Sequence, residues 1–97
     1  MIIERFTWKV RHTSQQQEEF IKSVKAMVEK GGWTGRTCTF MFGPSDIVIQ
    51  DLEFETEEDR QEFWTSIDWS LPEMAEFVKK YAALAESGAT HELLRVH

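Results

Sequence analysis

Two polar side chains interrupt the aromatic side of two predicted strands. Glu4 shares one side of residues 2–11 with Trp8, and Gln50 lies on the corresponding side of residues 47–54. A carboxylate on such a face must be paired or protonated, because an unpaired buried charge is costly. Glu4 and Gln50 are therefore either polar anchors of a ligand site or members of a structural ion-pair network that closes the core.

The partner expected for Glu4 is Arg95, which lies on the strand predicted for residues 91–97. Gln50 and Asp51 are further polar side chains that could reach a cavity. An enzyme could use these groups on a substrate, since perturbed ionisable groups gather at functional sites, but a structural ion-pair network explains them equally well.

Aromatic residues could line such a site. The chain has 4 tryptophans among 97 residues, and aromatic walls suit a flat apolar ligand. The same rings can pack as core, and one tryptophan can do both. If a cavity exists, we expect it between the sheet and the later helices or within a dimeric barrel, lined by Trp8, Phe42, Phe54 and Trp64.

Other chemistries lack their sequence signatures. The histidines His12, His91 and His97 have no metal-ligand spacing, so no metal site is predicted. Cys38 lies between threonines, which is typical of a buried inert thiol, and a single cysteine excludes an intrachain disulfide. The glycines are too few and wrongly placed for a phosphate cradle, and we predict no cofactor.

Charge and hydropathy limit the kinds of partner that we expect. The formal net charge is −6, and no Lys/Arg cluster is present, which disfavours binding to a phosphate backbone. We expect no nucleic-acid partner. No apolar run approaches the roughly 20 residues of a membrane span, and residues 1–5 do not start a signal peptide. A soluble, cytoplasmic protein without a membrane partner is expected.

The order of patterned segments predicts the fold. Alternating or apolar stretches indicate strands, the 3.6-residue period indicates helices, and Gly43-Pro44-Ser45-Asp46 indicates a hairpin turn. The expected order is strand 2–11, helix 14–30, strands 36–42 and 47–54, a helical stretch 56–86 interrupted near Asp68 to Pro72, and strand 91–97. This βαββαβ order, with the second helix split, is that of an α+β ferredoxin-like sandwich, with residues 1–97 as a single domain.

Several predicted strands are apolar on both faces. Helices can cover only one face of the sheet, so the other face should read as polar. Instead apolar residues are consecutive at Ile2-Ile3, Phe40-Met41-Phe42, Ile47-Val48-Ile49 and Leu93-Leu94. We therefore expect a homodimer that buries the second face. The aromatic side should meet the helices, because Arg5 and Lys9 on the other side would be costly there.

Four short segments resemble a known family. They are Met1-Ile2-Ile3-Glu4, Gly43-Pro44 before strand 47–54, the acidic residues 55–60, and residues 68–77 with Pro72-Glu73. The chain is similar in these to small bacterial members of the NIPSNAP family, in the dimeric α/β-barrel superfamily. The resemblance implies a homodimer whose two sheets pack into a barrel, with a poorly defined activity. Haem-degrading relatives rely on an asparagine, and this chain has none.

Three hypotheses for function follow. The first is a NIPSNAP-like homodimeric module of undefined activity that binds a small apolar or aromatic molecule. The second is a cofactor-independent monooxygenase or isomerase of the dimeric α/β-barrel type. The third is an interaction protein whose dimer is itself the functional unit. An enclosed cavity with converging polar groups would favour an enzyme, and a filled barrel would favour the third hypothesis.

Overall fold

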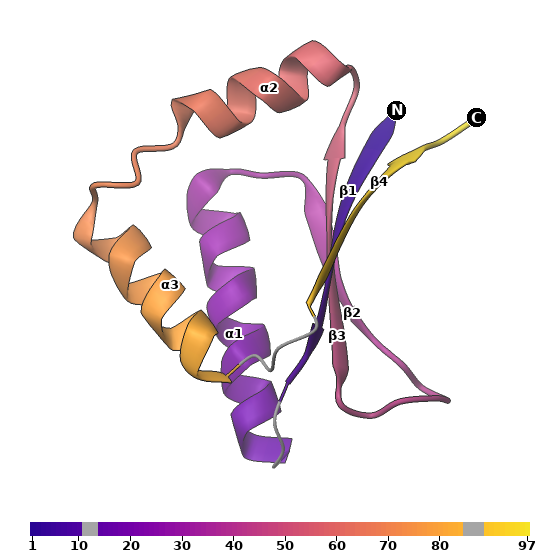
Figure 1. Ribbon diagram of the computed structural model, residues 1–97, viewed down its shortest axis with the longest axis vertical. Helices are drawn as coiled ribbons and strands as arrows, with labels where there is room; N and C mark the ends of the chain where they lie inside the picture. Colours follow the sequence, from indigo (N-terminus) through magenta and orange to yellow (C-terminus); the bar gives the residue numbers. More distant parts are fainter. Residues whose placement is uncertain (11–13, 85–88) are drawn as a thin grey trace.

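The computed structural model describes residues 1–10, 14–84 and 89–97. The elements follow the order β1, α1, β2, β3, α2, α3, β4 (Figure 1). This is the predicted ferredoxin-like order, with the second helix divided in two. The bounds are β1 Ile2–Lys9, α1 Ser14–Gly31, β2 Gly35–Thr39, β3 Ile47–Phe54, α2 Glu57–Ser66, α3 Pro72–Leu84 and β4 Thr90–Arg95.

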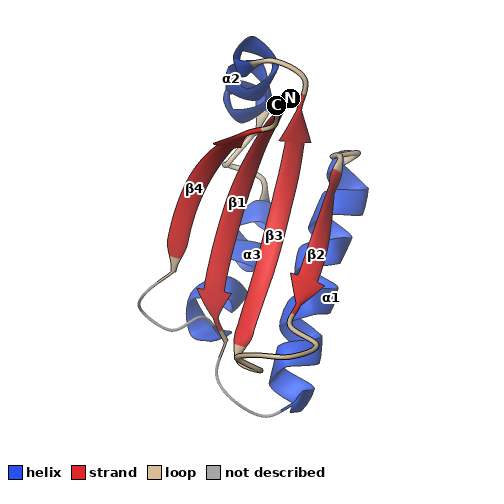
Figure 2. Ribbon diagram, turned by 90° about the vertical axis from the view of Figure 1, so that its right-hand side faces the viewer, coloured by secondary structure: helices blue, strands red, loops and turns tan. Residues whose placement is uncertain are grey.

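The four strands form one antiparallel sheet in the order β2-β3-β1-β4. The central strand β1 pairs with both β3 and β4, and Glu4 lies opposite Leu52 on one side and Leu93 on the other. All three helices lie on one face of the sheet (Figure 1). Seen from the other side, the strands lie in front and no helix covers them (Figure 2). Chain segments distant in sequence therefore meet above β1.

The core forms between β1, β3 and α1. Trp8, Val10 and Val48 from the sheet side pack with Phe20 and Val24 from the helix, and all five are buried. Each such side chain contributes roughly 1.5–3 kcal/mol by leaving water. The even-numbered, aromatic side of β1 thus meets the helices, as the cost of burying the basic side predicts.

The uncovered face carries a cross-strand ion pair. Arg5 donates from Nε and Nη2 to the two carboxylate oxygens of Asp51, at 2.8 and 3.0 Å, and lies directly opposite it in the register. Asp51 is only 1% exposed although no helix covers it. The hydrogen bonds from Arg5 to Asp51 raise the pKa of the guanidinium above its ordinary value.

Strand β2 is shorter than predicted. It ends at Thr39 rather than Phe42, and Phe42 is 91% exposed in the connection to β3. Gly43 has φ +122°, a conformation that favours glycine, and it turns the chain within this connection. Figure 1 shows the connection extending from the side of the sheet opposite the helices. Phe42 therefore lies apart from the aromatic residues under the helices.

The start of α2 follows its capping signal, whereas the start of α3 does not. The Thr56 hydroxyl accepts a hydrogen bond from the Asp59 backbone N–H at 3.1 Å and caps α2. Ser70, two residues before Pro72, does not cap α3. Its hydroxyl and backbone N–H instead donate back to the Asp68 carboxylate, and α3 begins at Pro72.

Candidate functional site

A cavity of about 280 Å³ lies between the sheet and the three helices. All 4 tryptophans of the chain line it: Trp8 on β1, Trp33 before β2, Trp64 on α2 and Trp69 in the α2–α3 connection. Aliphatic and aromatic side chains complete the wall. The remaining lining residues are Phe6, Val24, Met27, Val28, Gln50, Leu52, Met74, Phe77 and Val78.

The aromatic wall is built from stacked and edge-on rings. Phe6 stacks on Trp8, with 5.8 Å between centroids and 12° between planes, and meets Trp64 edge-on at 6.2 Å. Trp64 in turn lies parallel to Trp69 at 6.2 Å. Trp69 is 53% exposed, so it marks the solvent side of the wall. These geometries are the ones that aromatic quadrupoles favour, and they leave flat surfaces for a further ring.

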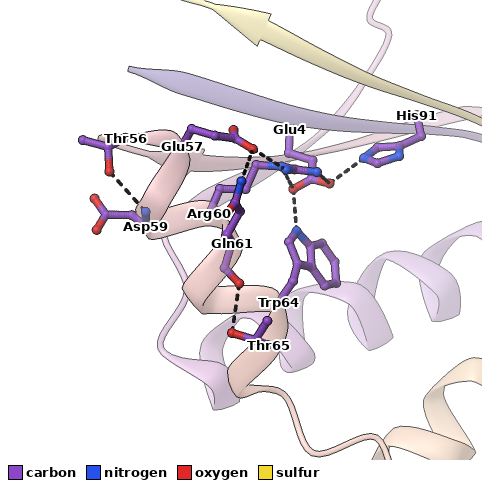
Figure 3. Close-up of polar contacts among 9 residues, drawn as sticks. All are labelled: Glu4, Thr56, Glu57, Asp59, Arg60, Gln61, Trp64, Thr65 and His91. Carbon is purple, nitrogen blue, oxygen red and sulfur yellow. Dashed lines mark hydrogen bonds and ion pairs between the residues drawn. The ribbon is translucent and has the colours of Figure 1, made fainter.

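Behind this wall, the Glu4 carboxylate accepts hydrogen bonds from three side chains (Figure 3). Arg60 reaches it with Nε at 3.0 Å and Nη2 at 3.4 Å, the Trp64 indole N–H at 2.7 Å, and His91 Nε2 at 2.5 Å. Glu4 is only 1% exposed. The buried charge is compensated, because a guanidinium, an indole N–H and an imidazole nitrogen surround it. We call these four residues the Glu4 cluster.

Local sequence explains how α2 delivers its two members of the cluster. The Thr56 cap and three acidic residues stabilise the first turn of the helix. Arg60 and Trp64 are four residues apart, so they lie on one helical face. Arg60 also donates to Glu57 at 2.9 Å, which fixes its orientation. Its pKa is raised, first by the hydrogen bond to Glu4.

Gln50 lines the cavity but already has partners on both ends of its amide. The Thr37 hydroxyl donates to its Oε1, and its Nε2 donates to the backbone carbonyl of Asp51 at 2.9 Å. Its hydrogen-bonding capacity is therefore directed into the sheet. A ligand in the cavity meets mainly carbon atoms.

The structure brings together only some of the predicted site residues. Trp8, Gln50 and Trp64 line the cavity, and Glu4 lies immediately behind Trp64. Phe54 packs on Phe63, with 5.2 Å between centroids, and is not part of the lining.

Besides that of Phe54, two of the predicted placements need correction. Phe42 lies outside the cavity, because β2 ends before it. Arg95 is not the partner of Glu4. It lies opposite Ile2 in the register and borders a separate hollow near the chain ends, with Glu57 and His97. Arg60 occupies the role expected of Arg95, because α2 docks over β1 and brings its guanidinium to the carboxylate.

Sequence reasoning misses the roles of Arg60 and His91, and it considers Trp33 and Trp69 only as two of the four tryptophans that could line a pocket. The sequence places His91 at the end of a strand and indicates no role for it. Arg60 could have been noticed, since it is the one basic residue within the acidic first turns of α2.

Within residues 1–10, 14–84 and 89–97, no three His, Cys, Asp or Glu side chains are placed to hold a metal ion. The helices of that described part include none that is long and apolar enough to cross a membrane. Cys38 is a free thiol, half-buried on β2.

No protein-family model matches the sequence, and no curated protein matches it. Solved structures do match over nearly the whole chain. A NIPSNAP domain protein from Burkholderia xenovorans is 15% identical, with a TM-score of 0.75, over 100% of this chain and 95% of that chain. A NIPSNAP family protein from Agrobacterium tumefaciens is 21% identical, with a TM-score of 0.75, over 99% of this chain and 92% of that chain. The chain has the NIPSNAP fold.

The same fold extends to a second group of proteins. A putative antibiotic biosynthesis monooxygenase from Nitrosomonas europaea is 10% identical, with a TM-score of 0.70, over 99% of this chain and 98% of that chain. At such identities the likeness is one of fold. The NIPSNAP fold of this chain is therefore shared with proteins named for an oxygenase activity as well as with proteins of undefined activity.

Proposed function

We propose that this NIPSNAP-like chain is a homodimeric module that binds a small, flat apolar or aromatic molecule in the cavity above β1 and β3. The observation that carries this proposal is the position of the tryptophans, since all 4 line one cavity. A core alone would not require their rings to border a common space. Aromatic walls with few polar groups are typical of small-molecule sites.

The size and chemistry of the cavity define the ligand class. Its volume of about 280 Å³ is just below the usual range for ligand sites, about 300–1,000 Å³, which suits a molecule of about two fused rings. Gln50 is already hydrogen-bonded and offers little polar recognition. Binding therefore depends on apolar area removed from water, at about 25 cal/mol per Å², and on ring stacking.

The test uses 2-methoxynaphthalene and the four indole N–H signals in a two-dimensional NMR spectrum. Addition of the compound should shift all four signals, because each indole borders the cavity. Val28→Trp should abolish these shifts by filling the space. Ala26→Trp adds the same ring on an exposed position of α1 and should bind normally. Unchanged indole signals in the unmodified protein would refute the proposal.

The dimer is supported by the uncovered face of the sheet. Ile3, Ile49 and Leu94 lie on that face, to judge from the strand registers. Ile3 is already buried within the chain. A second copy would bury Ile49 and Leu94 as well and would convert an open sheet into a two-layered barrel. Phe40 and Met41 are exposed in the connection between β2 and β3, which extends from the same side (Figure 1), and they would add apolar contact. A free thiol at Cys38 suits a reducing compartment, which supports a cytoplasmic location.

A second candidate function is a cofactor-independent monooxygenase or isomerase. The favouring observation is that the Glu4 cluster, with its ionisable groups, adjoins the cavity through Trp64. Oxygen uptake with a hydroxylated aromatic substrate, in buffer free of flavin and metal, tests for the monooxygenase. Product analysis under nitrogen tests for the isomerase.

A further inference from the structure

His91 is held at one nitrogen and one ring face, while half of its side chain remains exposed. Its Nε2 lies 2.5 Å from Glu4 Oε2, and its ring stacks on Phe6 with 4.6 Å between centroids and 5° between planes. The side chain is 50% exposed. Among the residues that the structure describes, Glu4 is the one polar partner of His91. The ring is thus oriented, and the edge that carries Nδ1 has no protein partner there.

The surroundings of Glu4 assign the proton on His91. Arg60 and the Trp64 indole already present N–H groups to the carboxylate, so a carboxyl proton would face donors and have no acceptor. Glu4 therefore accepts, and Nε2 of His91 donates. A neutral imidazole that donates from Nε2 has its lone pair on Nδ1. A carboxylate that fixes one histidine nitrogen in this way prepares the other nitrogen to accept a proton.

His91 does not line the cavity itself, but it contacts one residue of the cavity wall and shares a hydrogen-bond acceptor with another. Phe6 and Trp64 both line the cavity. Phe6 stacks directly on His91, and Trp64 shares its carboxylate acceptor (Figure 3). His91 is therefore one ring beyond the cavity wall. A ring bound between the tryptophans would need only a substituent directed past Phe6 toward β4 to meet the imidazole.

We propose that the ligand is a hydroxylated aromatic compound, a phenol or naphthol, and that His91 accepts the proton of its hydroxyl group. Glu4 is the positioning residue. In the full transfer, the O–H bond breaks, the proton binds Nδ1, and Nε2–H stays on Glu4. A phenolate then lies beside an imidazolium, and nothing is oxidised or reduced. This inference rests on the proposed cavity function and specifies its ligand.

The experiment compares 2-naphthol, which can donate a proton, with 2-methoxynaphthalene, which cannot. Dissociation constants come from titration of the indole N–H signals, and the quantity compared between variants is their ratio. His91→Phe keeps a ring on Phe6 and removes both nitrogens, so it should lower the preference for naphthol about tenfold. Binding of 2-methoxynaphthalene should change by less than about twofold. His97→Phe, which alters a histidine away from the cavity, should leave the ratio unchanged.

Two further variants keep the test decisive if His91→Phe folds poorly. His91→Gln can still donate to Glu4, and its amide oxygen can accept a hydrogen bond but is too weakly basic to take the proton. It should therefore lose most of the same preference. Glu4→Gln should also lower the ratio, because a neutral amide stabilises the protonated ring less. A merely structural role for Glu4 would weaken both compounds equally.

The outcomes separate this inference from the function on which it rests. If both compounds bind and the ratio is the same in the unmodified protein, His91→Phe and His91→Gln, the role of His91 is refuted and the apolar cavity stands. If neither compound binds the unmodified protein, the cavity function itself is refuted and the inference falls with it. A ratio that drops only in the His91 and Glu4 variants supports the proposal.

Discussion

At the residue scale, the Glu4 cluster shows how a charged side chain can be buried beneath a layer of helices. Glu4 is buried, and its carboxylate is surrounded by the guanidinium of Arg60 and the ring N–H groups of Trp64 and His91. Removal of one member of such a cluster leaves the others without partners in a dry environment, which costs more than the intact pair contributes. The cluster therefore fixes the position of Trp64, and with it one wall of the cavity.

Glu4→Gln should lower the free energy of unfolding by about 2–3 kcal/mol, because the amide cannot accept from all the donors that now face the carboxylate. Urea denaturation followed by circular dichroism measures this loss. Glu57→Gln is the matched control, since Glu57 also binds Arg60 but is exposed, and it should cost less than about 1 kcal/mol. Equal effects of the two substitutions would contradict the structural role of the cluster. Retained stability with lost binding would identify Glu4 as a ligand-site residue alone.

The burial and pairing of Glu4 could be predicted from the sequence, but the partner could not. Glu4 interrupts an aromatic face, which requires a compensating charge wherever that face is covered. The choice between Arg95 and Arg60 depends on where α2 docks, 56 residues along the chain. No local pattern encodes that position. The ring of His91 is stacked on Phe6 because β4 pairs with β1 in a register that short sequence motifs leave open.

At the element scale, the connection between α2 and α3 determines where Trp69 lies. The Asp68 carboxylate accepts from the Ser70 backbone N–H at 3.0 Å and from the Ser70 hydroxyl at 2.5 Å, which closes a tight turn around Trp69. Trp69 then stacks parallel to Trp64 at the cavity. The sequence predicts the break between the helices but not this turn. The turn depends on hydrogen bonds from Ser70 back to Asp68, and a helix pattern does not reveal them.

The Asp68 turn predicts a pH dependence. The hydrogen bonds from Ser70 lower the pKa of Asp68 below its ordinary value of 3.8. A carboxyl group with a lowered pKa stabilises the fold above its ordinary titration range, and this contribution is lost as the pH falls through the folded-state pKa. Carboxyl NMR titration should therefore give a midpoint below 3.8 for Asp68. Ser70→Ala should move that midpoint upward.

A control locates this effect in the turn. Ser66→Ala removes a hydroxyl that donates to the Phe63 carbonyl at the end of α2 and should leave the Asp68 midpoint unchanged. Ser70→Ala should also shift the Trp69 indole signal near neutral pH and not at a pH where Asp68 is protonated. A midpoint at 3.8 in the unmodified protein would show that the turn does not form in solution.

The element pattern itself was largely predictable. Helix α1 begins at Ser14, and β3 spans Ile47–Phe54, as hydrophobic periodicity indicates. The prediction makes strand β2 too long, because Phe40 and Phe42 have high strand propensity whether or not a partner strand is present. The ladder between β2 and β3 ends where Thr39 meets Val48, and the aromatic residues beyond it enter the connection. Propensity describes a pleated surface and does not determine where pairing stops.

At the scale of the whole molecule, the two faces of the sheet differ in what covers them. One face carries the helices, the core and the cavity, and the other has no helix upon it (Figure 2). The uncovered face mixes isoleucines with the Arg5–Asp51 pair, in which each charge already has a partner within the chain. A surface with internally satisfied charges and apolar side chains can be buried against a second copy at little electrostatic cost. A symmetric sheet-to-sheet dimer satisfies this condition, because both partners present the same paired charges.

The dimer proposal predicts a mass of about 23 kDa in solution, twice the 11.4 kDa of one chain. Sedimentation equilibrium at micromolar concentration measures it.

Ile49→Asp should dissociate or unfold the protein, since Ile49 lies on the uncovered face opposite Thr7 and Cys38, and a new carboxylate there would lose water without gaining a partner. Ala26→Asp places the same charge on the exposed side of α1 and should remain dimeric. A folded monomer in the unmodified protein would refute the dimer, and an Ile49→Asp variant that stays dimeric would place the interface elsewhere. Because the cavity lies on the opposite face of the sheet, a folded Ile49→Asp monomer should still shift all four indole signals with 2-methoxynaphthalene.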